Sequence, residues 1–335
     1  MNFENKQSDG KKIVIAILAI ILFGVLSVLL LVIILSRDTA DAISPPQWRE
    51  VMELHEIAYD SLGPFYQSQD DITVYIRENG VWEPFLVLEA SYPGQGNGGT
   101  LLLRKYLIQE RRPWVAQKNR RVGPNNVRPL GRDGLIDFRY YPMSDIDAWL
   151  ETEYISMFSP SIQDRILTAN IEVWDGWNHG REGAVRNVTV TETVPRRIFL
   201  LSENETRLMG RIGSGRQNRA IEGEPIAYFN PENSRYGDIQ TRQSLGNERR
   251  AATPRYEYAG LDDRGWTVIY SWWLRSVRWT TATGTIATIS HYGSAGGYSV
   301  MLTDYTFVRP AFTLPRDTVI EQYEVNGRLV YVIHD

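Results

Sequence analysis

The sequence contains no cysteine in 335 residues. Without thiols the chain has no disulfide framework, no thiolate metal site and no cysteine nucleophile. Histidine is scarce as well, and the four histidines (His55, His179, His291 and His334) lack the H-E-x-x-H and H-x-H spacings of metal sites. We therefore predict that the protein holds no metal and no cofactor.

Neither sign of charge dominates: the chain has 36 Lys and Arg residues and 40 Asp and Glu residues, a net charge of -4. This balance argues against a uniformly basic nucleic-acid binder, and 43% hydrophobic residues argue against a disordered chain. Gly210 to Gly215 is no phosphate-binding loop, and no G-x-S-x-G elbow occurs. We predict no catalytic residue, although carboxylates distant in sequence keep a hydrolase open as an alternative.

One long apolar run determines the predicted compartment. Residues 13–35 contain only Gly24 and Ser27 outside the apolar set. A helix of this length measures roughly 34 Å and spans a bilayer core of about 30 Å. A cleaved signal peptide is the rival interpretation, supported by the A-x-A pattern at Ala40-Asp41-Ala42.

The charges that flank this run predict its orientation. Lys6, Lys11 and Lys12 precede it, and only Arg37 follows closely. The positive-inside rule then makes residues 1–12 a cytoplasmic tail and places the remainder outside the cell. We expect a single-pass protein of the cell membrane, partnered by the lipid bilayer through residues 13–35. A large exported part without cysteine favours a Gram-positive bacterial surface.

The exported part begins with a linker and stalk helix over residues 36–65, with the helix itself at 47–62. Residues 72–76 and 81–90 alternate like strands around Asn79-Gly80, a two-residue hairpin turn, and a third strand follows at 101–103. A domain over 66–315 and a C-terminal hairpin over 316–335 complete the predicted organisation. Further strands are expected at 197–201, 271–275, 284–290, 297–302 and 307–312, and in the hairpin at 319–325 and 328–333.

Three segments carry helix-start signals. Ser144 to Asp147 and Ser202 to Glu205 read as capping boxes, and Pro160 follows Ser159 at a first helical position. The second box predicts a helix that Gly210 closes. Together these patterns predict an α+β domain with antiparallel strands, two to four short helices and long loops.

Four blocks resemble a family of exported bacterial proteins, domain of unknown function six-two-seven-three. They are Trp82 to Leu88, Ser144 to Ile166, Arg197 to Ser202, and a closing pair, WWLRS at 272–276 with VRPAF at 308–312. Their order and spacing fit over residues 70–315. The closing pair also resembles, more distantly, the C-type-lectin-like fold of the formylglycine-generating enzymes. Those enzymes depend on cysteine, so the resemblance implies a binding module on an enzyme-like scaffold.

Aromatic residues with small neighbours lie between the two halves of the closing pair. Rigid rings beside Gly and Ser suit contact with a sugar or a peptide. The candidate ligand-binding residues are Trp279, His291, Tyr292, Tyr298 and Arg275. The alternative is that the rings fill the core and that Arg275 pairs with a buried carboxylate such as Asp304 or Asp262.

A basic stretch covers residues 104–132, with nine Lys and Arg residues against one acid. Such a stretch can bind an anionic wall polymer or lipid headgroups. The candidate contacts are Arg111, Arg112, Arg120 and Arg121. The alternative is a solvated loop whose charges pair within the protein.

These observations favour a membrane-anchored extracellular binding module that recognises a glycan, a wall polymer or a protein, and no nucleic acid. A carboxylate-dependent hydrolase of wall or glycan substrates is the first alternative. A structural or regulatory partner of another membrane protein, acting through the stalk helix and the membrane segment, is the second.

Overall fold

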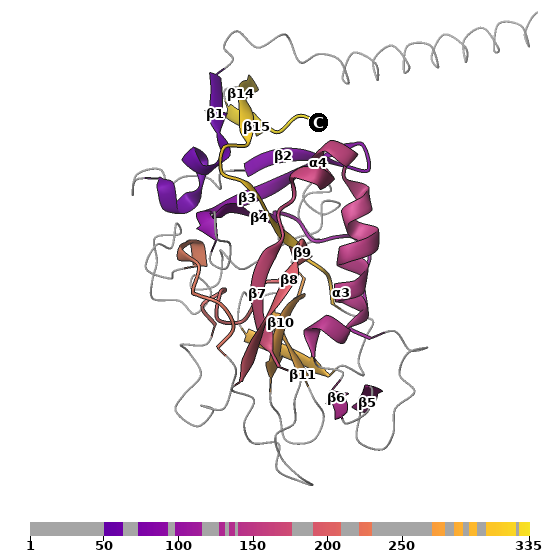
Figure 1. Ribbon diagram of the computed structural model, residues 1–335. Helices are drawn as coiled ribbons and strands as arrows, with labels where there is room; N and C mark the ends of the chain where they lie inside the picture. The colour runs from indigo at the N-terminus through magenta and orange to yellow at the C-terminus, as the bar shows by residue number, and fades with distance from the viewer. Residues whose placement is uncertain are drawn as a thin grey trace, which may run out of the picture. The chain divides into compact units, whose positions relative to one another are not determined.

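The computed structural model describes residues 50–62, 73–92, 98–115, 127–130, 134–137, 140–175, 190–208, 221–229, 270–278, 285–290, 295–299, 306–325 and 328–335 (Figure 1). The predicted membrane helix at 13–35 lies outside these residues. Within them, no helix combines the length and the apolar character that crossing a membrane requires. The chain divides into two compact units, Met1–Arg49 with Tyr323–Leu329, and Glu50–Gln322 with Val330–Asp335. The candidate site belongs entirely to the second unit.

The described residues are mostly β-structure with a few short helices. The largest sheet has eight strands in the order β1-β14-β15-β2-β3-β4-β13-β9. Its strands are β1 (Glu50–Glu53), β2 (Thr73–Glu78), β3 (Val81–Tyr92), β4 (Gly99–Arg104), β9 (Ile198–Phe199), β13 (Ala311–Pro315), β14 (Val319–Val325) and β15 (Arg328–Val332). β15 pairs with β2 in parallel, so the sheet is mixed, whereas the sequence predicted antiparallel strands.

Smaller sheets complete the β-structure. β10 (Trp272–Arg278), β11 (Thr285–Ile289) and β12 (Ala295–Ser299) form an antiparallel three-stranded sheet. Two hairpins pair β5 (Val127–Leu130) with β6 (Gly134–Asp137), and β7 (Ala169–Trp174) with β8 (Thr191–Arg196). The predicted strand at 307–312 begins later, at Ala311, as β13. The strands predicted at 271–275, 284–290 and 297–302 are present as β10, β11 and β12, with shifted ends.

The predicted meander at the start of the domain is confirmed. β2, β3 and β4 are consecutive antiparallel neighbours (Figure 1). Asn79 and Gly80 turn the first hairpin with φ angles of 52° and 79°, as the sequence predicts. All six residues of β4 are buried, so this central strand is covered on both faces.

The predicted stalk helix over 47–62 is wrong where the structure describes it. Residues 50–53 form β1, which pairs with β14, and two short 3-10 turns follow, η1 (Leu54–Ile57) and η2 (Tyr59–Ser61). Val51, an apolar residue within the predicted helix, is 60% exposed. The sheet supplies hydrogen-bond partners for the backbone here, and this long-range pairing overrides the local helical pattern.

Two of the three helix starts are confirmed. Ser144 Oγ accepts a hydrogen bond from Asp147 N at the start of α3 (Asp145–Trp149), and Ser159 Oγ accepts one from Ile162 N at the start of α4 (Pro160–Arg165). Between them the chain continues as η5 (Leu150–Tyr154) and η6 (Ile155–Met157). The remaining short helices are η4 (Tyr141–Met143) and η8 (Ala227–Phe229). The large apolar side chains that follow the first helix start are buried: Trp149, Leu150, Tyr154 and Phe158.

The third helix start forms its capping box but no helix. Glu205 N donates to Ser202 Oγ at 3.0 Å, and Ser202 N donates to the Glu205 carboxylate at 2.8 Å. The turn then closes at once, because Arg207 adopts a φ of 54° and Leu208 N bonds back to Glu203 O. These are the bonds of a helix C-terminus. The predicted helix up to Gly210 is therefore replaced, in its described part, by a single turn that presents Glu205 to the interior.

Candidate functional site

A buried ion pair lies at the centre of the candidate site. Arg275 on β10 is 0% exposed and holds the Glu205 carboxylate through two bonds of 2.7 Å, one from each terminal guanidinium nitrogen. Its remaining bonds go to the carbonyl oxygens of Glu172, at 2.9 Å, and Leu200, at 2.7 Å. The sequence predicts a buried carboxylate partner for Arg275 such as Asp304 or Asp262, whereas the structure shows that the partner is Glu205.

The Glu205 carboxylate has its acceptor positions filled. Besides the two Arg275 bonds it accepts the Tyr92 hydroxyl at 2.5 Å and the Ser202 N–H at 2.8 Å. A carboxylate offers about four lone-pair sites, so these four donors occupy it completely. Burial, and then the Glu205 charge, raise the pKa of Tyr92 well above its ordinary value, so its hydroxyl keeps its proton. Glu205 therefore has no acceptor position left with which to act as a general base.

A second buried carboxyl group adjoins this pair. Glu222 Oε1 accepts the Trp174 N–H at 2.7 Å, and its other oxygen accepts the Ser276 hydroxyl. Burial raises the pKa of Glu222 to about 7, against the opposing charge of Arg275. The Ser202 hydroxyl donates to the Glu222 carbonyl at 2.5 Å, which joins both carboxyl groups into one network.

The glycine after Glu222 allows the chain to pass Glu205 closely. Gly223 has a φ of +71°, and a Cβ built there would lie 2.5 Å from Glu205 Oε1. Its N–H donates to Glu172 Oε2 at 2.9 Å, and its carbonyl accepts from Asn204 Nδ2 at 2.5 Å. Both the backbone angle and the space therefore require glycine at this position.

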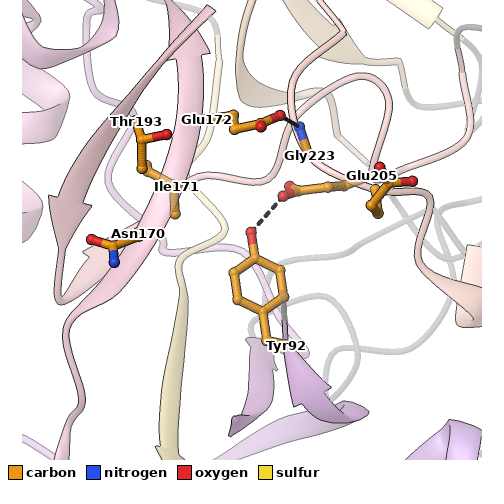
Figure 2. A pocket seen from close by; sticks show the side chains of 8 residues that line it. Tyr92, Asn170, Ile171, Glu172, Thr193, Glu205 and Gly223 are labelled. Atoms are coloured by element: carbon orange, nitrogen blue, oxygen red, sulfur yellow. Dashed lines mark hydrogen bonds between the residues drawn. The ribbon is translucent and has the colours of Figure 1, made fainter. Parts of the chain in front are cut away.

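A cavity of about 330 Å³ opens above this network. Figure 2 shows Tyr92 and Glu205 approaching from one side and the β7–β8 hairpin from the other. The lining residues are Tyr92, Asn170, Ile171, Glu172, Thr193, Glu205, Gly223 and Glu224. We call this cavity the β7–β8 pocket.

The β7–β8 hairpin gives the pocket a polar wall. Glu172 and Thr193 are directly opposed in the register, and Asn170 lies two residues before Glu172 on the same face. All three are exposed, whereas Ile171 between them is buried. The pocket thus combines an amide, a hydroxyl and a carboxylate on a hydrogen-bonded scaffold, with the ring of Tyr92 beside them. Among the described residues, no group of three His, Asp or Glu side chains is placed to hold a metal ion.

The structure places the ligand-binding residues predicted from sequence as follows. Arg275 is buried and holds the Glu205 carboxylate that lines the pocket, without lining it itself. Tyr298 is in β12, paired with Ile286. Trp279, His291 and Tyr292 lie outside the described residues, so a role for them stays a prediction.

The described part of the basic stretch has partners within the fold. The buried Arg104 pairs with Glu78 at 3.0 Å and with Glu83 at 2.9 Å. The Arg111 guanidinium lies 5.0 Å from the Phe307 ring centroid, and that of Arg112 lies 4.0 Å from the Trp149 ring centroid. Arg112 also contacts Glu110 at 3.1 Å. Arg120 and Arg121 lie outside the described residues, and polymer contact by this stretch remains a prediction.

The model of the family Domain of unknown function (DUF6273) matches residues 97–316, which is more than half of the chain. The chain belongs to the DUF6273 family. The DUF6273 match runs from just before β4 to just after β13 and includes every pocket residue except Tyr92. A search of curated proteins found no match, and a search of solved structures found none either.

Proposed function

We propose that the protein is a membrane-anchored extracellular binding module that takes a segment of a glycan, a wall polymer or a protein into the β7–β8 pocket. The observation that carries this proposal is the chemistry of the pocket. Its exposed wall offers an amide, a hydroxyl and carboxylates, while its buried carboxylate, Glu205, has every acceptor position filled. Such a site binds polar ligands, and its buried Glu205 carboxylate is not free to act on them as a base.

The hydrolase alternative has less support. A glycosidase pairs a carboxyl group of raised pKa with a second carboxylate across the substrate. Burial raises the pKa of Glu222 to about 7 and, with the charge of Asp60, that of Glu89 to about 8. Neither side chain lines the pocket. The second alternative, a structural or regulatory partner, invoked the stalk helix and the membrane segment; β1 and two short turns replace the described part of the helix, and the membrane segment lies outside the described residues.

We further propose that residues 13–35 form the anchor, that the N-terminus is cytoplasmic, and that the DUF6273 domain has a C-type-lectin-like fold. The length of the apolar run and its preceding lysines support the first two points. The third point is supported by the closing sequence pair, whose Trp272, Trp273 and Arg309 are all buried.

The test uses the full chain in detergent on an array of glycans and wall polymers. Asn170→Ala combined with Thr193→Ala removes two exposed polar groups from the pocket wall. Asp164→Ala changes an exposed acid on α4, away from the pocket lining, and serves as the control. We expect the protein and the control to retain the same ligands and the double variant to lose them. Undiminished binding by the double variant would exclude the β7–β8 pocket as the site.

A further inference from the structure

The described residues that line the β7–β8 pocket carry charges of one sign. Glu172 and Glu224 both line it and are both exposed, and no Lys or Arg is among the lining residues of the described chain. The guanidinium of Arg275 is neutralised by the two bonds to Glu205 and is fully buried. The described part of the wall that a ligand meets is therefore net negative.

One of these carboxylates is held in a fixed position. Glu172 Oε2 accepts the Gly223 N–H at 2.9 Å, which ties β7 to the segment that carries Glu224. Within the described residues no donor contacts the second oxygen of Glu172, so this oxygen is available to a ligand. A pre-positioned carboxylate loses little side-chain entropy when a ligand binds.

The neighbours of Glu172 suit hydroxyl groups. The Thr193 hydroxyl and the Asn170 amide both donate and accept hydrogen bonds, as the hydroxyls of a sugar ring do. At about 330 Å³ the cavity is near the lower end of small-ligand pockets, which extend from about 300 to 1,000 Å³. This size favours a short segment of a glycan.

We infer that the β7–β8 pocket selects a glycan segment that carries a free, protonated amino group, such as a de-N-acetylated hexosamine residue. This inference rests on the proposed binding function and names its ligand class. The ammonium group donates charge-assisted hydrogen bonds to Glu172 and Glu224, while the ring hydroxyls meet Thr193 and Asn170. An N-acetylated sugar loses the charged donor, and a phosphate or uronate group faces carboxylates of its own sign.

The test compares two oligosaccharides with the same backbone. The full chain in detergent is titrated by calorimetry with a glucosamine hexamer and with an N-acetylglucosamine hexamer, at a pH at which the free amines are protonated. We expect the glucosamine hexamer to bind about tenfold more tightly, with a preference that shrinks as salt is added.

The matched variant is Glu172→Gln with Glu224→Gln, which removes both charges and keeps an oxygen at position 172 for the Gly223 N–H. It should bind the two hexamers equally, while Asp164→Asn on α4 should keep the preference of the unchanged protein. Equal affinities of the unchanged protein for the two hexamers, or a preference that survives in the double variant, would overturn the ligand class. The proposed binding function would not be affected by either result. If neither hexamer binds, but other ligands on the array bind and lose binding in the Asn170 and Thr193 double variant, the ligand class is overturned and the binding function is retained. Failure of every array ligand to bind overturns the binding function as well.

Discussion

Replacing Arg275 tests the buried network most severely. Arg275→Met keeps most of the side-chain volume but leaves the Glu205 carboxylate buried without its cation, and it removes the donors to Glu172 O and Leu200 O. Removing one partner of a buried ion pair costs about 3–5 kcal/mol. Domains are stabilised by only about 5–15 kcal/mol in total, so the variant should lose roughly a fifth or more of its stability.

Urea denaturation of the full chain in detergent, followed by tryptophan fluorescence, measures this loss. The variant Arg275→Lys keeps the charge without the two-pronged contact, so its stability should lie between those of the unchanged protein and Arg275→Met. Replacing Glu205 by Leu as well should recover part of the loss, because no unpaired charge then remains buried. A loss below about 1 kcal/mol for Arg275→Met would refute the reasoning that this pair supports the pocket.

Three further predictions follow from the same region and from the helix starts. Burial raises the pKa of Glu222 from 4.5 to about 7, so the folded protein holds this proton more tightly than the unfolded chain, and stability falls as pH rises through that window. Denaturation as a function of pH should therefore show Glu222→Gln gaining roughly 3 kcal/mol relative to the unchanged protein between those limits, and parallel curves would contradict this. Gly223→Ala should cost about 2 kcal/mol and weaken ligand binding, since its Cβ meets Glu205; normal stability and affinity would show that the close approach is unimportant. Ser144→Ala should cost about 1 kcal/mol in urea through loss of the bond from Asp147 N, and an unchanged midpoint would contradict the cap.

The elements that sequence predicted correctly depend on local chemistry. Asn79 and Gly80 accept positive φ angles at little cost, so the hairpin is determined by its own two residues. Ser144 and Ser159 supply their caps from within the same turn. Interactions of this kind require no knowledge of what lies elsewhere in the fold.

The sequence predictions fail where a residue distant in sequence determines the local structure. Residues 50–53 read as part of a helix, yet β14, more than 260 residues away, converts them into a strand. The capping box at Ser202 was visible, but the turn closes at Arg207 and directs the Glu205 carboxylate to Arg275. Only the folded chain brings these groups together.

The same limit applies to the candidate site. Arg275 stood out in the sequence, but its partner is 70 positions away and no spacing rule connects the two. The need for glycine at position 223 is explained only by its approach to Glu205. Asn170 and Thr193 form one polar face only when β7 pairs with β8. Alternation along β7, with exposed Asn170 and Glu172 around buried Ile171, was the one local signal available for this wall.

We propose that the β7–β8 pocket faces the outside of a cell and receives a glycan there. The most direct measurement is photo-crosslinking on intact bacterial cells that display the full chain, with a photoreactive residue at Thr193 or, as the control, at Asp164. We expect covalent capture of surface polysaccharide from position 193 and none from position 164. Capture that is equal at the two positions, or absent at both in protein that an external protease cannot reach, would contradict it.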